Sequence, residues 1–324
     1  MEISETAVIS GTARDLLVAL QNLCFDMPFV EHNGMMENRW IFRGHASHKW
    51  KLAPSAFRGS SCSIAAQVQW ESDCFGAFLS HCDTAGLDTA EYSPDVMADV
   101  NDGEILKRAL RETASFRFGI NSWPRPSDLH NLALAQHNGL PTRLLDWTRD
   151  PFIAAYFAAS EVVKAKAKGE KTGSRTLSIW ALDTKILWEL YALAKGAAAV
   201  RLIFAANSRN RRLFVQRGLF TLVHANYVPK GGVSAITLQK VLESELTSLA
   251  ENARELAESH PRCKTIRRVL ARARREPIIK RFDLPYKEIR VLMRHLAARG
   301  IMANTIYADL EGAARATSEQ DYWL

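Results

Sequence analysis

The stretch GLPTRLLDWTRDPFIAAYFA, residues 139–158, contains the signals that decide the fold. Asp150 and Pro151 are typical of a helix start, because Asp caps free N–H groups and Pro needs no N–H at the first helical position. The following helix is apolar nearly all round through Ala159, so we expect it to lie at the centre of the protein. The preceding TRLLDW segment is expected to be extended, and the helix N-terminus should point back at it.

Segments on both sides of this stretch indicate a mixture of strands and helices. In the strand predicted over residues 39–46, Phe42 and Arg43 project from opposite faces, because side chains alternate along a strand. Further strands are predicted over 175–183, from about 218, and over 278–285, with a loop or hairpin at 164–174. Helices are predicted within the first thirty residues and over about 62–82, 104–118, 127–139 and 285–300.

These elements predict a single domain over residues 1–324 of the α+β class. The chain is 47% hydrophobic and 24% charged, so it can bury a large core, and it shows no internal repeat or linker. We expect a central mixed or antiparallel sheet with helical additions at both ends. The core should span about 38–225, followed by a C-terminal helical and basic part over about 235–324.

The sequence shows no signal for a membrane or a metal. The most apolar segment, 151–163, is shorter than the roughly 20 residues that cross a bilayer, so no membrane partner is predicted. The opening residues lack an export signal, and we expect a cytoplasmic protein. The five cysteines form no C-x-x-C pair, which predicts reduced, mostly buried thiols. His81 with Cys82, or His45 with His48, lacks a second pair of ligands, so no metal is assigned.

Positive charge is concentrated near the C-terminus. The formal net charge is +7, and residues 262–281 hold nine Lys or Arg against one Glu. Such a segment favours contact with the phosphates of a nucleic acid or a nucleotide. The alternative is a solvated helix face, with Lys264, Arg268 and Arg272 four residues apart and paired with the acidic segment 242–260.

The sequence contains no phosphate-binding glycine loop, zinc-protease motif or nucleophile elbow. Instead, Arg43 and Arg143 near a helix N-terminus favour an anion, such as a pyrophosphate. Trp147 or Tyr156 would offer a ring for stacking, and Asp146 would accept a hydrogen bond or stabilise positive charge. The alternative is that Arg143 and Asp146 form a buried ion pair, with Trp147 in the core.

Four stretches resemble, in the same order, the FRG-domain family, named for a Phe-Arg-Gly motif that is here Phe42, Arg43 and Gly44. The most specific part is Gln136 and His137 followed by residues 141–147. The family has no assigned activity, so the resemblance implies a domain type rather than a reaction. The stretches are FRGHASHKWKLAPSAFR (42–58), LAQHNGLPTRLLDWTRDPFIAAYFA (134–158), RRLFVQRGLFTL (211–222) and LPYKEIRVLMRHLAARGIMANTIYADLEG (284–312).

The segment TRLLDWTRDPFIAAYFA also resembles, more distantly, the part of ADP-ribosyltransferases in which a Ser-Thr-Ser strand runs into a helix. This resemblance implies an ADP-ribosyltransferase-like sheet and NAD as substrate. Arg43 would hold the phosphates or ribose of NAD, and residues 142–148 would replace the Ser-Thr-Ser strand, which is absent. The implied NAD-binding residues are Arg43, Gly44, Thr142, Arg143, Trp147 and Tyr156.

The implied chemistry needs a group that stabilises positive charge. Cleavage of the nicotinamide glycosidic bond passes through an oxocarbenium-like state, which a carboxylate stabilises. The glutamate of the transferases has no clear match, and the candidates are Asp146, Gln216, Asp309 and Glu311. Gln216 would orient ribose but carries no charge, which favours Asp146. His137 would act as a base toward the nucleophile; alternatively, it is a structural cap or ion-pair partner at its helix end.

These patterns favour an NAD-dependent ADP-ribosyltransferase-like enzyme, an intracellular toxin or defence effector that modifies nucleic acid or protein. The basic segment would recruit a polyanionic acceptor, and an inhibitory antitoxin or a chaperone is the kind of regulatory partner implied. The alternative is a non-catalytic nucleotide- or nucleic-acid-binding module, in which the same arginines hold the ligand and Asp146 is structural. Plain NAD hydrolysis is a third hypothesis.

Overall fold

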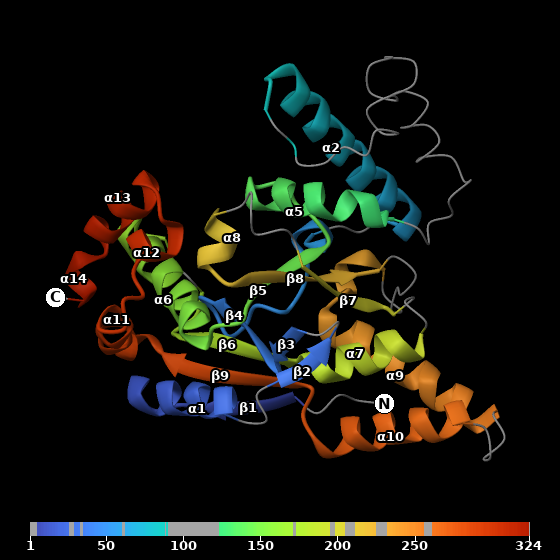
Figure 1. Cartoon of the computed structure of the whole chain (residues 1–324). Coiled ribbons are helices and arrows are strands. Elements are labelled where there is room, and N and C mark those ends of the chain that lie inside the picture. The colour runs from blue at the N-terminus through green and yellow to red at the C-terminus, as the bar shows by residue number, and fades with distance from the viewer. Residues whose placement is uncertain are drawn as a thin grey trace.

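The computed structural model describes residues 5–25, 29–32, 35–59, 62–87, 89, 123–170, 173–194, 198–204, 211–224, 232–255 and 261–323 (Figure 1). The helix predicted over 104–118 lies outside these residues. The strands are β1 (Glu5–Ile9), β2 (Phe29–His32), β3 (Met35–Asn38), β4 (Trp40–His45), β5 (Leu144–Thr148), β6 (Thr176–Asp183), β7 (Val200–Ile203), β8 (Gly218–Val223) and β9 (Ile279–Pro285). The helices are α1 (Ala13–Phe25), α2 (Ile64–Thr84), α5 (Leu129–His137), α6 (Pro151–Ala167), α7 (Thr184–Leu193), α8 (Arg211–Val215), α9 (Leu238–Glu255), α10 (Pro261–Arg275), α11 (Ile289–Ala297), α12 (Ala303–Tyr307), α13 (Leu310–Ser318) and α14 (Gln320–Trp323).

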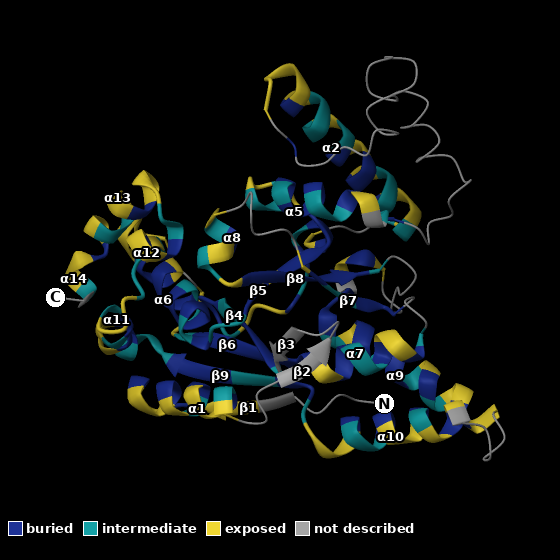
Figure 2. Ribbon diagram, in the orientation of Figure 1, coloured by how far each residue is buried: buried dark blue, intermediate teal, exposed yellow. Residues whose placement is uncertain are grey.

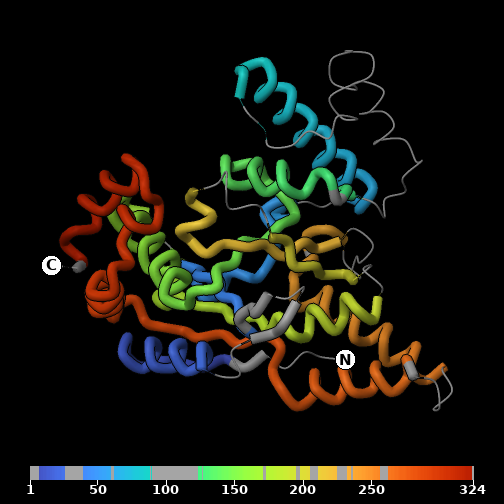
Figure 3. The backbone as a smooth tube through the Cα atoms, viewed as in Figure 1, coloured from blue at the N-terminus to red at the C-terminus, as the bar shows by residue number. Residues whose placement is uncertain are grey.

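Seven of these strands form a mixed sheet in the order β1-β9-β6-β4-β5-β8-β7. Every neighbouring pair is antiparallel except β1 and β9, which are parallel. The expected α+β class and mixed sheet are therefore confirmed. The C-terminal strand β9 lies inside the sheet between β1 and β6, so the C-terminal part completes the sheet rather than adding to a finished core. Figure 3 follows the chain from β9 into α11–α14, beside α6.

Apolar side chains alternate between the two faces of the sheet, as the period of a strand requires. One face packs against α7, α9 and α10 and includes Ile41, Leu145 and Trp147. The opposite face is covered in two parts. Helices α1, α6 and α11 cover the β9-β6-β4 part, and α2, α5 and α8 cover the β5-β8-β7 part. Figure 2 shows the buried strands, with α6 and α11 at the left and α2 and α5 at the top.

The strands β4 and β5 are joined over a very short length. Their only aligned pair is Phe42 with Thr148, whereas β4 pairs with β6 along its whole length. Beyond Phe42 the two strands therefore separate, which frees the main-chain groups that would otherwise complete the ladder. The sheet is thus split at the Arg43 position of β4 and the Asp146 position of β5.

The central helix α6 starts as the sequence predicts. Asp150 is its N-cap and accepts hydrogen bonds from the N–H groups of Phe152 and Ile153, with Pro151 at the first helical position. These bonds occupy N–H groups that were expected to bind an anion, and Arg217 pairs with the same carboxylate. The expectation of an anion at this helix N-terminus is therefore not supported. The helix also continues to Ala167, so the expected loop at 164–174 begins later.

Close packing of α6 on β4 depends on Gly44. A Cβ atom at this position would lie 2.0 Å from the carbonyl oxygen of Ala154 and 2.7 Å from the nitrogen of Ala158. Both atoms belong to the helix backbone, which cannot yield as a flexible side chain does. The glycine of the Phe-Arg-Gly motif is therefore required where the helix crosses the strand.

Most of the basic segment near the C-terminus forms α10, while Lys280 and Arg281 lie on β9. The charges of α10 divide between two environments. Arg272 points inward and pairs with Asp183 on β6 and with Glu189 on α7. This pairing differs from the expected one with the acidic segment. Lys264 and Arg268 remain exposed on the outer face, as the solvated-face alternative expects. Among the residues described, no helix is both long enough and apolar enough to span a membrane.

Candidate functional site

A cavity of about 480 Å³ lies where β4 and β5 separate. Its floor includes Arg43 of β4 and Asp146 of β5, and its walls come from α5, α6, α8 and α12. This volume is within the range of small-molecule binding sites. The cavity thus occupies the junction between the two groups of helices on this face of the sheet.

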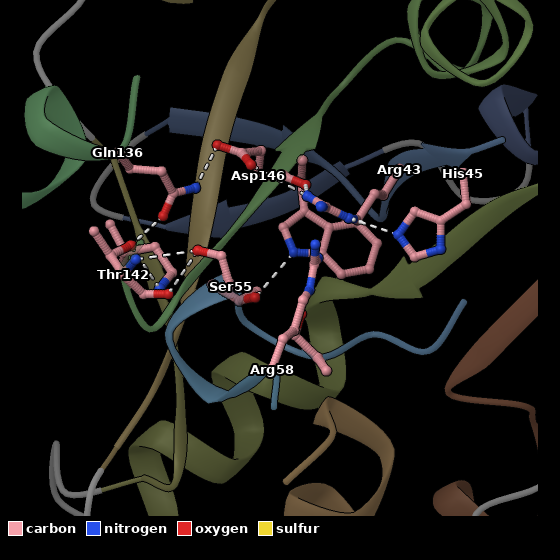
Figure 4. Close-up of polar contacts among 11 residues, drawn as sticks. Arg43, His45, Ser55, Arg58, Gln136, Thr142 and Asp146 are labelled. Atoms are coloured by element: carbon pink, nitrogen blue, oxygen red, sulfur yellow. Dashed lines mark hydrogen bonds and ion pairs between the residues drawn. The ribbon is translucent and has the colours of Figure 1, made fainter. Parts of the chain in front are cut away.

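Arg43 and Asp146 form the centre of the cavity (Figure 4). Arg43 Nη1 donates to the carbonyl oxygen of Asp146 at 2.7 Å and lies 3.3 Å from its carboxylate Oδ2. The separation of β4 from β5 leaves the main-chain carbonyl of Asp146 without a strand partner. The Arg43 guanidinium donates a hydrogen bond to it instead. The Asp146 side chain is 58% exposed and that of Arg43 17%. The carboxylate is therefore positioned by the arginine and still open to a ligand.

A chain of hydrogen bonds positions Asp146 from the other side. Gln136, near the end of α5, donates through Nε2 to Asp146 Oδ1 at 2.6 Å. Thr142 donates its hydroxyl to Gln136 Oε1, and Ser55 Oγ accepts the Thr142 main-chain N–H at 3.1 Å. Figure 4 shows Gln136 between Asp146 and Thr142. Both carboxylate oxygens of Asp146 are therefore oriented toward fixed donors.

His45 positions Arg43 as an uncharged acceptor. Arg43 Nε donates to His45 Nε2 at 3.0 Å, and His45 Nδ1 lies 3.3 Å from the carbonyl oxygen of Trp50. Trp180 Nε1 also donates toward His45 Nδ1, at 3.1 Å, so both ring nitrogens face a donor. Burial and the neighbouring Arg43 charge lower the pKa of His45 to about 3. The ring therefore remains neutral near neutral pH and preserves the positive charge of Arg43.

Arg58 adds a second positive charge to the cavity. It lines the wall, and its Nε and Nη2 atoms donate to the carbonyl oxygen of Ala53 at 3.2 and 3.1 Å. Within the described part of the chain, no carboxylate lies within ion-pair distance of Arg58. Desolvation, followed by repulsion from Arg43, lowers the pKa of Arg58. Two guanidinium groups therefore raise the local positive potential, which favours an anion.

Glu161 is an acidic cavity residue that the sequence analysis missed. It projects from α6 on the same stripe as Ala154 and Phe157, which also line the cavity. Its charge acts favourably on Arg58, together with that of Asp146. The aromatic rings of Phe157 and Tyr307 meet edge to face, with centroids 6.3 Å apart, in the same wall. The cavity thus combines two carboxylates, three arginines including Arg212, and an aromatic wall.

A third arginine closes the cavity on the side of α8. Arg212 Nε donates to Asp309 Oδ2 at 2.7 Å, and its Nη2 donates to Glu311 Oε2 at 2.9 Å. Neither acid lines the cavity. Asp309 and Glu311, which the sequence analysis considered as catalytic carboxylates, thus lie outside it and hold Arg212 in place. Through these contacts, Arg212 links α8 to the start of α13.

Two further sequence candidates, His137 and Gln216, line the cavity. Burial, followed by the nearby Arg212 charge, lowers the pKa of His137. The imidazole is therefore neutral at neutral pH and is able to accept a proton. Gln216 is tied to the carbonyl oxygen of Ile306 through Nε2 at 3.4 Å. Its amide thus lies against the C-terminal helices.

Arg143 lies outside the cavity. Its side chain is fully buried and forms a two-point ion pair with Glu71 of α2, at 2.6 and 2.9 Å. Glu71 also accepts hydrogen bonds from Trp123 and Gln67. The alternative pairing of Arg143 with Asp146 is wrong, because Arg143 directly precedes β5 and side-chain alternation directs it away from the face of Asp146. Arg143 instead joins β5 to α2, and it does not reach a ligand in the cavity.

Three other residues expected to bind NAD are held by the protein itself. Trp147 is part of the cavity wall, but its ring packs in the core and its Nε1 donates to Thr221 Oγ1 at 2.9 Å. Tyr156 is fully buried and donates its hydroxyl to Glu319 at 3.0 Å; burial raises its pKa. Thr142 is buried behind Gln136. Stacking on Trp147 or Tyr156 is therefore not supported, and Thr142 acts through Gln136.

The described residues include no group of three His, Cys, Asp or Glu side chains that could hold a metal ion. The five cysteines are all free thiols; Cys82 and Cys263 are buried and the other three half-buried. The expectation of mostly buried thiols is therefore met only in part.

Comparison with known proteins identifies the domain. Residues 38–167 match the family model described as the FRG domain, which confirms the family expected from the sequence. No curated protein and no solved structure matches the chain. The matched residues include Arg43, Arg58, Gln136, Asp146 and Glu161, so most of the cavity floor and the α6 wall belong to the FRG domain.

Proposed function

We propose, from the premise that residues 38–167 of this chain are an FRG domain, that the cavity binds NAD and that the protein is an ADP-ribosyltransferase. The observation that carries the proposal is the position of Asp146. Its accessible carboxylate lies beside two guanidinium groups, those of Arg43 and Arg58, in one cavity. The arginines fit a pyrophosphate, and the carboxylate fits a sugar carbon that becomes positive.

The phosphate part of the proposal rests on charge. Among the described residues, the hydrogen bonds of Arg43 use Nε and Nη1, which leaves Nη2 for a ligand. Arg58 is bound by a neutral carbonyl and is repelled by Arg43. A pyrophosphate between them would relieve this repulsion and accept charge-assisted hydrogen bonds, each contributing about 1.5–3 kcal/mol.

The reaction part of the proposal rests on the two carboxylates. When the bond between ribose C1′ and the nicotinamide nitrogen breaks, its electron pair leaves with neutral nicotinamide and C1′ becomes positive. Asp146, oriented by Gln136 and Arg43, would stabilise this charge without having to reorganise. An acceptor hydroxyl then forms the new bond to C1′ and loses its proton. Glu161 and His137 are the cavity groups able to receive it.

The sheet supports an ADP-ribosyltransferase-like fold for this domain. The strand with the Phe-Arg-Gly motif and the strand that runs into α6 are neighbours that separate beyond Phe42, and the cavity lies in the opening. The aromatic wall of Phe157 and Tyr307 takes the stacking role that the sequence analysis gave to Trp147 or Tyr156. Toxin or defence effector remains the proposed biological class.

The experiment that tests this function uses NAD labelled on its adenine side and a cell lysate as the source of acceptors. Nicotinamide release and transfer of label to protein and RNA fractions are measured together. We expect both signals from the wild type and the loss of both from Asp146→Asn. Asp83→Asn, which changes an exposed carboxylate on α2, is the matched control and should behave as the wild type.

Each other outcome has a defined meaning. Nicotinamide release without labelled acceptor identifies an NAD hydrolase. Binding of NAD without release contradicts catalysis and supports the non-catalytic binding module. Equal release by the wild type and Asp146→Asn contradicts the role given to this carboxylate.

A further inference from the structure

A second cavity of about 480 Å³ adjoins the first one. The two cavities share Trp50 and Glu161, and the second is otherwise lined by Ala46 and by Lys164, Ala165, Lys168 and Glu170. The charge of its wall therefore differs from that of the first cavity. Lysines replace arginines, and Glu161 marks the boundary.

One stripe of α6 forms the wall of both cavities. Ala154, Phe157 and Glu161 line the first cavity, and Glu161, Lys164, Ala165 and the C-cap residue Lys168 line the second. These spacings of three and four residues put all the side chains on one face of the helix. Lys166 belongs to the opposite side and is exposed. A molecule bound along this stripe would place one end at Glu161.

We propose that the second cavity is the acceptor site, that its acceptor is a single-stranded nucleic acid, and that Glu161 receives the proton of the acceptor hydroxyl. The assignment of Glu161 rests on the proposed transferase function. The binding of nucleic acid by the second cavity does not require it.

The lysines fit successive phosphates of one strand. Lys164 and Lys168 are both exposed and one helical turn apart, so their Cα atoms are about 6 Å apart along the axis. This distance is comparable to the spacing of neighbouring phosphates in a single strand. Within the described ranges, Lys168 forms one ion pair, a 3.9 Å contact with Glu170 in which both side chains are exposed. Such a pair is weak and is readily exchanged for a phosphate.

Trp50 supplies the surface for a base. Its side chain is 47% exposed, a large fraction for a tryptophan that borders two cavities. His45 fixes the ring edge to face, with centroids 6.0 Å apart. Stacking on an aromatic ring accepts any base and accompanies phosphate contacts in single-strand binding. An acidic peptide would use the lysines but would leave the Trp50 ring without a partner, so the observations favour a nucleic acid.

Glu161 is the acidic group that faces both molecules. A hydroxyl of the strand would enter between the cavities, transfer its proton to the Glu161 carboxylate, and form an oxygen bond to ribose C1′. The bond from C1′ to nicotinamide breaks at the same carbon, and its electrons leave with nicotinamide. Glu161 also keeps the phosphates of the strand at the lysine end by repulsion.

Binding is tested without NAD, by the fluorescence anisotropy of a labelled single-stranded RNA ten nucleotides long. Lys164→Ala with Lys168→Ala should weaken binding by about tenfold or more and reduce the salt slope of log K by about 1.4. Trp50→Ala should weaken it about fivefold or more. Lys166→Ala is the matched control and should bind as the wild type. Equal binding by the wild type and the double lysine variant would overturn the acceptor site, whatever the result with NAD.

The role of Glu161 is tested by Glu161→Gln with labelled NAD and the same RNA. We expect the ratio of label transferred to RNA over free ADP-ribose to fall at least tenfold, with RNA binding equal to or tighter than that of the wild type. An unchanged ratio would overturn the role of Glu161. If the wild type releases no nicotinamide, the transferase function fails and the assignment of Glu161 fails with it; the binding experiment still decides the site.

Discussion

Arg43 Nη1 contacts two atoms of Asp146 across the opening between β4 and β5. The carbonyl oxygen of Asp146 lies 2.7 Å away and its carboxylate Oδ2 3.3 Å away. The arginine replaces a ladder hydrogen bond with a charged side-chain contact. One interaction therefore closes the backbone of the split sheet and aims a carboxylate into the cavity. Because His45 accepts from the same guanidinium, the position of Asp146 also depends on a buried neutral imidazole.

Asp146→Asn should lower the rate of nicotinamide release about 100-fold or more while leaving the fold intact. The side chain is more than half exposed, and an exposed ion pair contributes at most about 1 kcal/mol. An asparagine oxygen also still accepts from Gln136. Thermal unfolding measured beside activity checks both parts. A large fall in melting temperature would show that Asp146 is structural.

Arg143→Ala should destabilise the protein by about 3–5 kcal/mol, because it leaves the buried Glu71 carboxylate without its cation. The free energy of unfolding, obtained from denaturant titration, measures this change. Arg275→Ala, at an exposed position of α10, is the control and should change stability by less than about 0.5 kcal/mol. Similar values for the two variants would contradict the role of the Arg143–Glu71 pair.

Gly44→Ala should prevent α6 from packing on β4. The added methyl group would meet two backbone atoms of the helix well inside contact distance. We therefore expect the free energy of unfolding to fall by about 3 kcal/mol or more. Gly11→Ala is a matched control, since nothing lies within 4 Å of a Cβ atom built there. Circular dichroism melts of both variants test the difference. A Gly44→Ala protein as stable as the wild type would contradict this packing.

His45 should make stability depend on pH. Its folded pKa of about 3 lies below its ordinary value of 6.5, so the unfolded chain binds the proton more readily. The contribution of the neutral ring is therefore complete above pH 6.5 and is lost as the pH falls toward 3. We expect about 2 kcal/mol less stability at pH 5 than at pH 7 from this group. In His45→Gln this part of the pH dependence should disappear; an unchanged profile would contradict the buried neutral state.

Glu245 should make the protein less stable as the pH rises, which is the opposite of the effect of His45. Burial raises its pKa to about 7, and its Oε1 accepts the N–H of Ala199 at 3.1 Å. Its contribution to stability is complete below the ordinary value of 4.5 and is lost as the pH rises through 7. Glu245→Gln keeps an acceptor oxygen and removes the charge, so its melting temperature should exceed that of the wild type at pH 8 and approach it at pH 5. A lower melting temperature at pH 8 would contradict the prediction.

Local signals predicted the centre of the site. Asp150 and Pro151 mark the start of α6, and strand alternation puts Arg43 opposite Phe42, so the two strands that form the floor could be read from the sequence. Arg43, His137, Asp146 and Gln216 do meet in one cavity. What brings them together is the separation of β4 from β5, which no local pattern encodes.

Long-range pairing explains what the sequence did not predict. Glu71 is 72 residues away from Arg143, whereas proximity in the sequence offers Asp146 as the alternative partner. Glu161 lies where the apolar part of α6 gives way to charged residues. At such a position the sequence predicts a solvent-exposed carboxylate rather than a cavity residue. The parallel pairing of β1 with β9 joins strands from opposite ends of the chain. Each of these features depends on packing rather than on neighbouring residues.

The most direct test of the central claim is calorimetric titration of NAD into Asp146→Asn, which should bind without turnover. We expect binding similar to that of the wild type, and binding about 10- to 150-fold weaker when Arg43→Ala or Arg58→Ala is added, since each change removes charge-assisted hydrogen bonds to the pyrophosphate. If NAD does not bind to the wild type, or binds equally well without Arg43 and Arg58, the cavity is not an NAD site.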